Sequence, residues 1–337
     1  MRANLFAGLV ATAVAVTAAQ AGPTLDAVKS RGVLKCGVAG DAPGFSAPNA
    51  KGEMTGLDAS VCRAVAAAVL GDSSKVQFVP TNTQTRFPTL QSGEIDMLAR
   101  TATMTFTRDT TLGLLFGPPV FYDGQGLMVA KKLGVKSAKE LNGATVCVSP
   151  GTTSELNLAD YFRANKMQFK PVVIESLDQV RTTFFSGRCD VMTDDRSTLA
   201  SNRTVASNPD DYVILSETIS KEPLAPVVRQ GDDQWFTILR WVVFALITAE
   251  EQGVTKANVD EKRQSGAPDV QFFLGKDEQS AKGLGLKADW AYQAVKQAGN
   301  YGEIYAQSVG EASPLKLPRN LNELWTNGGL MYAPPIR

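Results

Sequence analysis

Two arginines and four threonines lie within the nine residues 100–108, directly after the apolar run 95–99. A guanidinium group can hold a carboxylate through two parallel, charge-assisted hydrogen bonds, and hydroxyl and backbone N–H groups supply further donors. One interpretation is therefore an anion-binding loop at the end of a strand. The alternative is a polar surface loop with solvated arginines, whose ion pairs would contribute little.

A second part of the chain repeats this pattern with the opposite charge. The stretch 89–97 (TLQSGEIDM) and the stretch 183–191 (TFFSGRCDV) share a Thr, a Ser-Gly pair and an Asp at the same spacing. The first stretch runs into Arg100, whereas the second runs into Asp194 and Asp195. A helix, a Ser-Gly pair, a strand and a polar loop thus occur twice. We expect two similar lobes that hold a zwitterion between them.

The composition is that of a globular protein with more than one domain. Its 337 residues are 44% hydrophobic and 20% charged, which favours two ordered domains. Lys and Arg together equal Asp and Glu at 34 each, so the net charge does not favour nucleic acid or an anionic membrane as partner. Because the chain has no histidine, Ser-His-Asp catalysis, Cys-His catalysis and imidazole-dependent zinc sites are excluded. We expect no nucleic acid, metal or cofactor.

The N-terminus has the order of a secretory signal. A positively charged start is followed by an apolar run over 5–19 and then by a small-x-small cleavage motif that ends at Ala21. We therefore expect a signal peptide over 1–21, cleavage after Ala21 and export from the cytoplasm.

Four cysteines in an exported chain are expected to form disulfide bonds, and four allow three sets of pairs. Cys36 and Cys147 each lie in the apparent first strand of a lobe, whereas Cys62 and Cys189 come later in the same two lobes. We predict the pairs Cys36–Cys62 and Cys147–Cys189, each contributing roughly 3 to 4 kcal/mol through loop-closure entropy. A redox-active thiol pair is the alternative, but no Cys-x-x-Cys spacing exists.

Alternating helix and strand patterns predict α/β lobes with parallel strands and right-handed crossovers. A Gly/Pro-rich passage over 116–126 is interpreted as a first crossing between the lobes, and 220–226 as the return crossing. The expected domains are lobe I over 22–124, lobe II over 125–224, and a completion of lobe I with a C-terminal helical extension over 225–337.

Three positions lie near the carboxyl ends of strands, where ligands bind in open α/β sheets. Phe45, in a Gly/Pro loop after the first strand, either covers an apolar ligand side chain or packs under its own loop. Arg86 lies in the opening turn of a helix near the same edge. Thr152 and Glu155 form a capping box, so the free N–H groups at that helix start should face the cleft and suit a carboxylate.

Several motifs together resemble the polar amino-acid solute-binding proteins of ABC importers. They are, in order, RGVLKxGV at 31–38, GxxxGxD at 52–58, LQSGxxD at 90–96, TxTR at 105–108, PGTT at 150–153 and GxxD at 187–190. The long C-terminal part and the four cysteines resemble the general L-amino-acid-binding subfamily. Where family members often carry an aromatic shortly before the loop phenylalanine, this chain has Ala42-Pro43-Gly44.

The resemblance implies a fold, a function and partners. The fold is the two-lobed periplasmic-binding-protein fold of type II, in which each lobe is an open, mostly parallel sheet flanked by helices and two hinge crossings join the lobes. The function is capture of a broad range of L-amino acids, with acidic and amide side chains favoured. The partners are an inner-membrane ABC permease and its ATPase subunits, and the binding protein is expected to be a monomer.

The resemblance also implies a role for each polar group. Arg108, the arginine of the T-x-x-R motif, would clamp the ligand α-carboxylate, and Asp195, five positions after the Gly-x-x-Asp aspartate, would take the α-amine. Arg86 lies in a segment similar to one in glutamate/aspartate binders, which implies contact with a side-chain carboxylate or amide. Further hydroxyl and amide contacts are implied for Thr101, Thr103, Thr152 and Thr153.

Two other functions are alternatives to this prediction. A periplasmic dehydratase for prephenate or arogenate could use Asp194 or Asp195 as its acid/base group. The lack of histidine and the mixed charge of the cleft favour a bound zwitterion over that enzyme. A ligand-sensing module of a membrane receptor would need a transmembrane or signalling segment, and we find none in this sequence. We therefore predict a solute-binding protein and not an enzyme.

Overall fold

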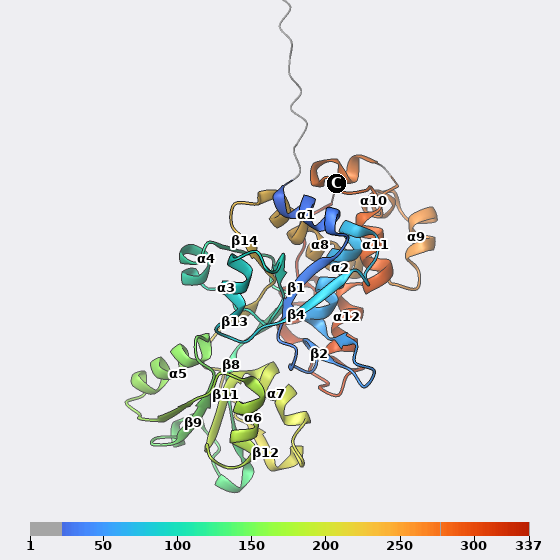
Figure 1. The fold of residues 1–337 in the computed structure, drawn as a ribbon. Helices are drawn as coiled ribbons and strands as arrows, with labels where there is room; N and C mark the ends of the chain where they lie inside the picture. The colour runs from blue at the N-terminus through green and yellow to red at the C-terminus, as the bar shows by residue number, and fades with distance from the viewer. Residues whose placement is uncertain (1–21, 277, 337) are drawn as a thin grey trace, which may run out of the picture.

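Two five-stranded sheets form the framework of the chain in the computed structural model, which describes residues 22–276 and 278–336. Each sheet is flanked by helices and belongs to its own lobe, and the two lobes lie one above the other in Figure 1. The expected signal peptide, residues 1–21 with cleavage after Ala21, lies outside the described residues.

The sheet of the first lobe has the order β4-β1-β5-β14-β6. Its strand β1 is the run LKCGV, of which all but one residue are buried, as expected for a strand covered on both faces. The Ala- and Val-rich helix α2 packs on this strand. It ends at Gly71, which has a φ of 73°, a left-handed conformation that glycine adopts readily because it lacks a Cβ. The strands are β1 (Leu34–Val38), β4 (Val76–Pro80), β5 (Met97–Leu98), β6 (Leu114–Phe116) and β14 (Val227–Arg229). The helices that precede the first crossing are α1 (Pro23–Arg31), α2 (Leu57–Leu70), α3 (Arg86–Gln91) and α4 (Phe106–Thr111), with a β-hairpin of β2 (Ala47–Pro48) and β3 (Met54–Thr55).

The sheet of the second lobe has the order β10-β9-β11-β8-β12. Apolar side chains of its strands pack against the flanking helices in two separate clusters, one around Phe162 and one around Phe184. The strands are β8 (Gln125–Ala130), β9 (Thr145–Val148), β10 (Lys170–Val173), β11 (Val191–Asp195) and β12 (Tyr212–Ile214). The helices are α5 (Thr153–Ala164), α6 (Leu177–Phe185) and α7 (Arg196–Thr204).

One strand in each sheet runs against the other four. Strand β14 is antiparallel to β5 and β6, and β8 is antiparallel to β11 and β12, whereas the remaining pairings are parallel. The expectation of mostly parallel sheets is therefore confirmed. Because β8 and β14 are the strands that directly follow the two crossings, each starts at the edge where the parallel strands end. Asp195 at the end of β11 consequently pairs with Gln125 at the start of β8.

Two short strands connect the lobes. Strand β7 (Phe121–Asp123) and strand β13 (Glu222–Leu224) pair antiparallel, with Glu222 opposite Asp123. They lie within the two crossings expected from the sequence. The carboxyl ends of the parallel strands in both sheets face this hinge region (Figure 1). Residues from the polar loops of both lobes line one cavity there.

Residues after the return crossing complete the first lobe. The apolar side chains of α8 (Asp233–Glu251) share one hydrophobic core with those of β1 and α2. The later helices are α9 (Val259–Ser265), α10 (Pro268–Phe273), α11 (Trp290–Ala298) and α12 (Tyr301–Ser308). In the part of the chain that the structure describes, no helix has the length and apolar character needed to cross a membrane.

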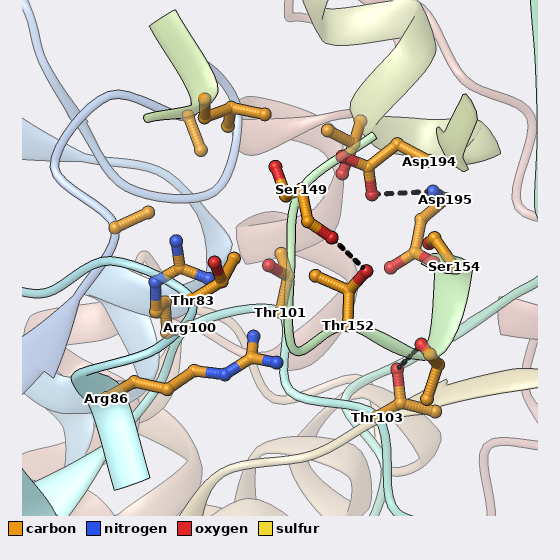
Figure 2. A pocket seen from close by; sticks show the side chains of 15 residues that line it. Thr83, Arg86, Arg100, Thr101, Thr103, Ser149, Thr152, Ser154, Asp194 and Asp195 are labelled. Carbon is orange, nitrogen blue, oxygen red and sulfur yellow. Dashed lines mark hydrogen bonds between the residues drawn. The ribbon is translucent and has the colours of Figure 1, made fainter. Parts of the chain in front are cut away.

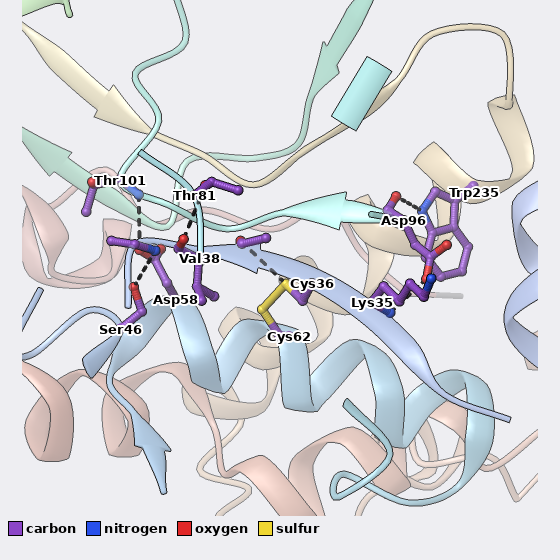
Figure 3. Close-up of a disulfide and its surroundings, with 12 residues drawn as sticks. Lys35, Cys36, Val38, Ser46, Asp58, Cys62, Thr81, Asp96, Thr101 and Trp235 are labelled. Atoms are coloured by element: carbon purple, nitrogen blue, oxygen red, sulfur yellow. Dashed lines mark hydrogen bonds between the residues drawn. A yellow bond between two sulfur atoms is a disulfide. The ribbon is translucent and has the colours of Figure 1, made fainter. Parts of the chain in front are cut away.

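The structure pairs Cys36 with Cys62 and Cys147 with Cys189, as predicted. The first pair joins β1 to α2 at a Cα–Cα distance of 6.2 Å (Figure 3). The second lies in the second lobe at 5.7 Å. Each bond therefore fastens a helix or loop to the strand whose end reaches the cleft.

Candidate functional site

A small polar cavity lies between the lobes, at the carboxyl ends of the parallel strands. Its free volume is about 40 Å³. Side chains of both lobes line it, with hydroxyl groups between charged groups of opposite sign (Figure 2). The polar lining residues are Thr83, Arg86, Arg100, Thr101, Thr103, Ser149, Thr152, Thr153, Ser154, Asp194, Asp195 and Thr198.

The first lobe supplies the positive charge. Arg86 is the first residue of α3 and Arg100 follows β5, and both side chains are buried. Nε of Arg100 donates to the backbone O of Thr81 at 2.9 Å, whereas Nε of Arg86 has no hydrogen-bond partner among the described residues. Burial lowers the pKa of both groups, and Arg100 and Arg108 lower that of Arg86 further. An anion bound here would relieve both the burial cost and the repulsion.

The second lobe supplies the negative charge. Asp194 and Asp195 are the last two residues of β11, and in Figure 2 their side chains lie across the cavity from the arginines. Burial raises the pKa of Asp194 to about 6. Burial, followed by the charges of Asp123, Asp194 and Glu222, raises the pKa of Asp195 well above its usual range. A cation placed among these carboxyl groups would be strongly favoured.

Hydroxyl groups from both lobes meet between the two charged sides. Thr152 is the N-cap of α5, and its Oγ1 accepts from the N–H of Glu155 at 3.1 Å. The Glu155 carboxylate accepts from the N–H of Gly151, at 2.9 Å, so the reciprocal bond of the expected capping box falls one residue earlier. Thr103 and Thr153 approach each other across the cleft, with 3.5 Å between their Oγ1 atoms.

Six of the eight residues expected at the ligand line this cavity, and two do not. Arg108 lies beside it: its Nη1 donates to the backbone O of Thr103 at 2.9 Å, and its side chain is buried. Phe45 is buried in the core of the first lobe, with its ring edge against Phe121 at a centroid distance of 5.5 Å. The structure thus places Phe45 in the core and not in the lining of the cavity.

Four lining hydroxyls were not singled out from the sequence, those of Thr83, Ser149, Ser154 and Thr198. Oγ1 of Thr83 and Oγ of Ser149 are buried and have no hydrogen-bond partner within the described part of the chain. Ser149 directly follows β9, and Thr83 precedes Arg86 by three residues. The position of Ser149 at the end of a strand could have indicated from the sequence that it lies at the site. The position of Thr83 could not, because it depends on how its loop folds.

The buried carboxyl groups predict an unusual pH dependence of the ligand-free protein. Asp58 and Asp194 have folded-state pKa values of about 6, raised by burial from an ordinary 3.8. A carboxyl group whose pKa is higher in the folded state than in the unfolded state makes its full contribution to stability at pH values below the unfolded-state pKa. That contribution is lost as the pH rises through the folded-state pKa. We expect the free energy of unfolding to fall between pH 4 and pH 6, relative to an Asp194→Asn variant. Urea unfolding of both proteins measures this, and a difference independent of pH would contradict it.

Comparisons with known proteins agree with this geometry. The chain matches the family model of the bacterial extracellular solute-binding proteins, family 3, over residues 34–311. It is 54% identical to the general L-amino acid-binding periplasmic protein of Rhizobium johnstonii, over 98% of this chain and 97% of that protein. It is 51% identical to the glutamate/glutamine/aspartate/asparagine-binding protein of Rhodobacter capsulatus, over the full length of both.

A solved structure has the same fold throughout. The periplasmic binding protein of an ABC transporter from Brucella ovis, with glutathione bound, superposes with a TM-score of 0.91 at 50% sequence identity. The match covers 93% of this chain and 99% of that one.

Proposed function

Because the chain belongs to the bacterial extracellular solute-binding proteins of family 3, we propose that it captures L-amino acids between its lobes and delivers them to an ABC importer. The observation that carries this proposal is the separation of charge across one cavity, with arginines on the first lobe and aspartates on the second. An α-amino acid carries a carboxylate and an ammonium group on one carbon. Such a ligand satisfies both sides at once.

Each part of the ligand has a partner in this proposal. Arg108 holds the α-carboxylate, and Asp195 holds the α-ammonium group. Arg86 faces a side-chain carboxylate or amide, so that acidic and amide amino acids are favoured within a broad range. The hydroxyls that complete the site are those of Thr101, Thr103, Thr152 and Thr153.

Ligand binding then stabilises the closed arrangement of the lobes. The ligand bridges Arg108 on the first lobe and Asp195 on the second, contacts that an open cleft cannot make together. Direct contacts between the lobes add to this, since Oγ of Ser201 in α7 donates to the backbone O of Pro43 at 2.8 Å. A ligand with more contacts in the closed state shifts the population towards it, and the importer can distinguish the two states.

The dehydratase alternative is not favoured. The relatives that cover this chain from end to end are named as amino-acid-binding proteins and not as enzymes. The site offers carboxyl groups for acid/base chemistry, but these lie opposite arginines in the arrangement that a zwitterion needs. We therefore favour solute binding over dehydratase activity for this protein.

Location and partners follow from the same proposal. The Rhizobium johnstonii relative and the Brucella ovis structure are named as periplasmic proteins. We propose that this chain is also periplasmic and that residues 1–21 are removed after Ala21 on export. The mature protein acts as a monomer with an inner-membrane permease and its ATPase subunits. Its domains are 22–124 and 225–337 for the first lobe and 125–224 for the second.

A thermal-shift panel tests the proposal. Mature protein is unfolded and refolded to remove retained ligand, and the twenty L-amino acids are added singly. A ligand at about 100 times its dissociation constant adds ~2.7 kcal/mol and raises the melting temperature by a few degrees. We expect shifts for several amino acids, the largest for glutamate, aspartate and their amides. The matched control is 2-oxoglutarate, which lacks the amine and should give no shift. Turnover of prephenate without any amino-acid shift would reverse the choice of function.

A further inference from the structure

A segment near the C-terminus, residues 317–322, lies against the hinge strand β7. It follows α12 and falls outside residues 34–311, the range that the family model matches. A groove of about 560 Å³ lies between it and α7 of the second lobe. We call residues 317–322 the C-terminal strap. The strap is an addition to the part of the chain that the family model describes.

One residue of β7 has both backbone groups turned away from its partner strand. Tyr122 lies opposite Pro223 of β13, and the Pro223 O accepts from the N–H of Met104. The two residues thus form a non-hydrogen-bonded pair, in which the N–H and C=O groups of each point away from the other strand. The backbone groups of Tyr122 consequently need partners on the free edge of β7.

Asn322 supplies both partners with one side chain. Its Oδ1 accepts from the Tyr122 N–H at 2.6 Å, and its Nδ2 donates to the Tyr122 O at 3.1 Å. A primary amide carries an acceptor and a donor in one plane, so it completes the edge of β7 as a further strand would. Asn322 is buried, so water competes little for these two bonds.

Arg319 fixes Asn322 to the first lobe. Its Nε and Nη2 donate to the backbone O of Asn322, at 3.1 and 2.8 Å. The same guanidinium forms an ion pair with Glu250 of α8, and it lies over the rings of Tyr301 and Tyr305 of α12, 5.4 and 5.5 Å from their centroids. Two helices of the first lobe therefore hold the strap in place.

Helix α12 also holds the hinge directly. The hydroxyl of Tyr301 donates to the backbone O of Val120 at 2.9 Å. The rings of Tyr305 and Phe121 are stacked, with 5.9 Å between centroids and 5° between planes. Three successive residues, from Val120 to Tyr122, are thus attached to the first lobe.

The contacts of the hinge strands change from the first lobe to the second directly after Tyr122. The Asp123 carboxylate accepts from the N–H of Ser197 in α7, at 3.1 Å. On β13, the Glu222 carboxylate accepts from the hydroxyl of Thr153 in α5, at 2.8 Å. The pairing register places these two acidic residues opposite each other, so the change falls at the same level on both strands. The lobes can therefore turn about one line across the paired strands.

We propose that the C-terminal strap is a conformational device that keeps β7 on the first lobe and confines lobe movement to this line. The inference rests on the proposed function, in which closure of the lobes holds the ligand. With the strap attached, closure orders little beyond the cleft. With the strap released, β7 gains freedom in the open state, and ligand binding must order the hinge as well. The strap thereby raises the affinity for every ligand by the same factor.

Asn322→Asp tests the strap, because aspartate keeps the shape of asparagine but turns a second acceptor towards the Tyr122 O. Isothermal titration of L-glutamate and L-glutamine into refolded mature protein should show both affinities reduced at least fivefold, by factors that agree within twofold. Tyr301→Phe, which removes the hydroxyl bound to Val120, should lower both by a smaller common factor. Asn320→Asp, the same change at an exposed position of the strap, should leave both affinities within twofold of wild type.

Amide hydrogen exchange distinguishes release of the strap from a general loss of stability. In ligand-free Asn322→Asp, the amide of Tyr122 should exchange at least threefold faster than in wild type, and saturating L-glutamate should slow it again. Exchange in β1, in the core of the same lobe, should not change. Tyr301→Phe is judged by the same criteria, so the test stands if Asn322→Asp does not fold.

The contrary outcomes are specific. Unchanged affinities, with or without faster exchange at Tyr122, would overturn a role of the strap in closure. Unequal losses for the two ligands would place the effect in the ligand cavity, and faster exchange in β1 would make it a general destabilisation; either would also overturn the inference. Binding of neither amino acid by the wild-type protein would overturn the proposed function and this inference with it.

Discussion

Replacing Asp195 with asparagine is expected to abolish amino-acid binding and to stabilise the ligand-free protein. Asp195 is buried, and its pKa is raised by burial and then by Asp123, Asp194 and Glu222. In the ligand-free state its carboxyl group therefore destabilises the fold at neutral pH, and asparagine removes that cost. In the complex, the α-ammonium group would be left buried without its counter-ion, which costs ~3 to 5 kcal/mol, or about 100-fold to several thousand-fold in affinity.

Two measurements test the two parts of this prediction, the loss of affinity and the gain in stability. Isothermal titration gives the affinity, and urea unfolding of the refolded protein gives the stability at pH 7. Wild-type affinity should rise with pH through the raised pKa of Asp195, because the ammonium group binds the ionised carboxyl group. Asp195→Asn should lose that pH dependence. Retention of wild-type affinity by this variant would refute the assignment of Asp195 to the amine.

Asp190→Asn is the matched control in the same segment. The Asp190 carboxylate accepts from Oγ1 and N–H of Thr145, at 2.6 and 2.8 Å, and those bonds lower its pKa. This group precedes β11 and lies away from the cavity. The same chemical change there should reduce stability and leave the affinity intact.

Replacing Arg108 with methionine is expected to lower the affinity for every amino acid by a similar factor. In the proposed complex Arg108 holds the α-carboxylate, which all ligands share, and loss of one partner of a buried ion pair costs ~3 to 5 kcal/mol. Arg108→Lys should recover part of the affinity, because lysine keeps the charge but lacks the planar fork. Isothermal titration of glutamate and leucine measures both variants. Arg163→Met, at an exposed arginine of α5, is the control and should bind normally.

The structure also provides a specific rival for this role. Arg100 lines the cavity directly, whereas Arg108 reaches it beside Thr103. If Arg100→Met abolished binding of leucine and Arg108→Met did not, the α-carboxylate would lie on Arg100. Leucine distinguishes the two assignments because it has only one carboxylate, so no second carboxylate can bind the other arginine.

At the cavity, the first lobe carries buried arginines and the second lobe carries buried aspartates. Each set of like charges lowers the stability of the ligand-free protein and favours binding of a zwitterion. The guanidinium carbons of Arg86 and Arg108 lie 4.8 and 5.2 Å from the centroid of the Phe87 ring. The arginines repel one another across the first lobe, and the carboxyl groups do so across the second. A zwitterion neutralises both sets together, so closure around the ligand relieves strain that the ligand-free protein carries.

Local features of the sequence determined much of this molecule. The capping-box pattern at Thr152 predicted a helix start, and the structure has Thr152 as an N-cap that accepts from the N–H of Glu155. Thr105 is also an N-cap, accepting from the N–H of Arg108, although we had interpreted that motif only as an anion-binding loop. The repeated Ser-Gly-x-x-Asp pattern predicted two lobes with opposite charges at matching strand ends. The positions of the four cysteines in those lobes predicted both disulfide pairs. These signals are readable because capping, strand length and chain order depend on near neighbours.

Tertiary structure decided which of the expected side chains line the cavity and which further side chains join them. Phe45 and Arg86 follow strands of one sheet, yet Phe45 packs into the core while Arg86 lines the cavity. Thr83 and Ser149 come from different lobes, and both line the cavity because the hinge brings the two lobes together. Lateral strand order and lobe closure set these distances, and both arise from long-range packing that no local pattern encodes.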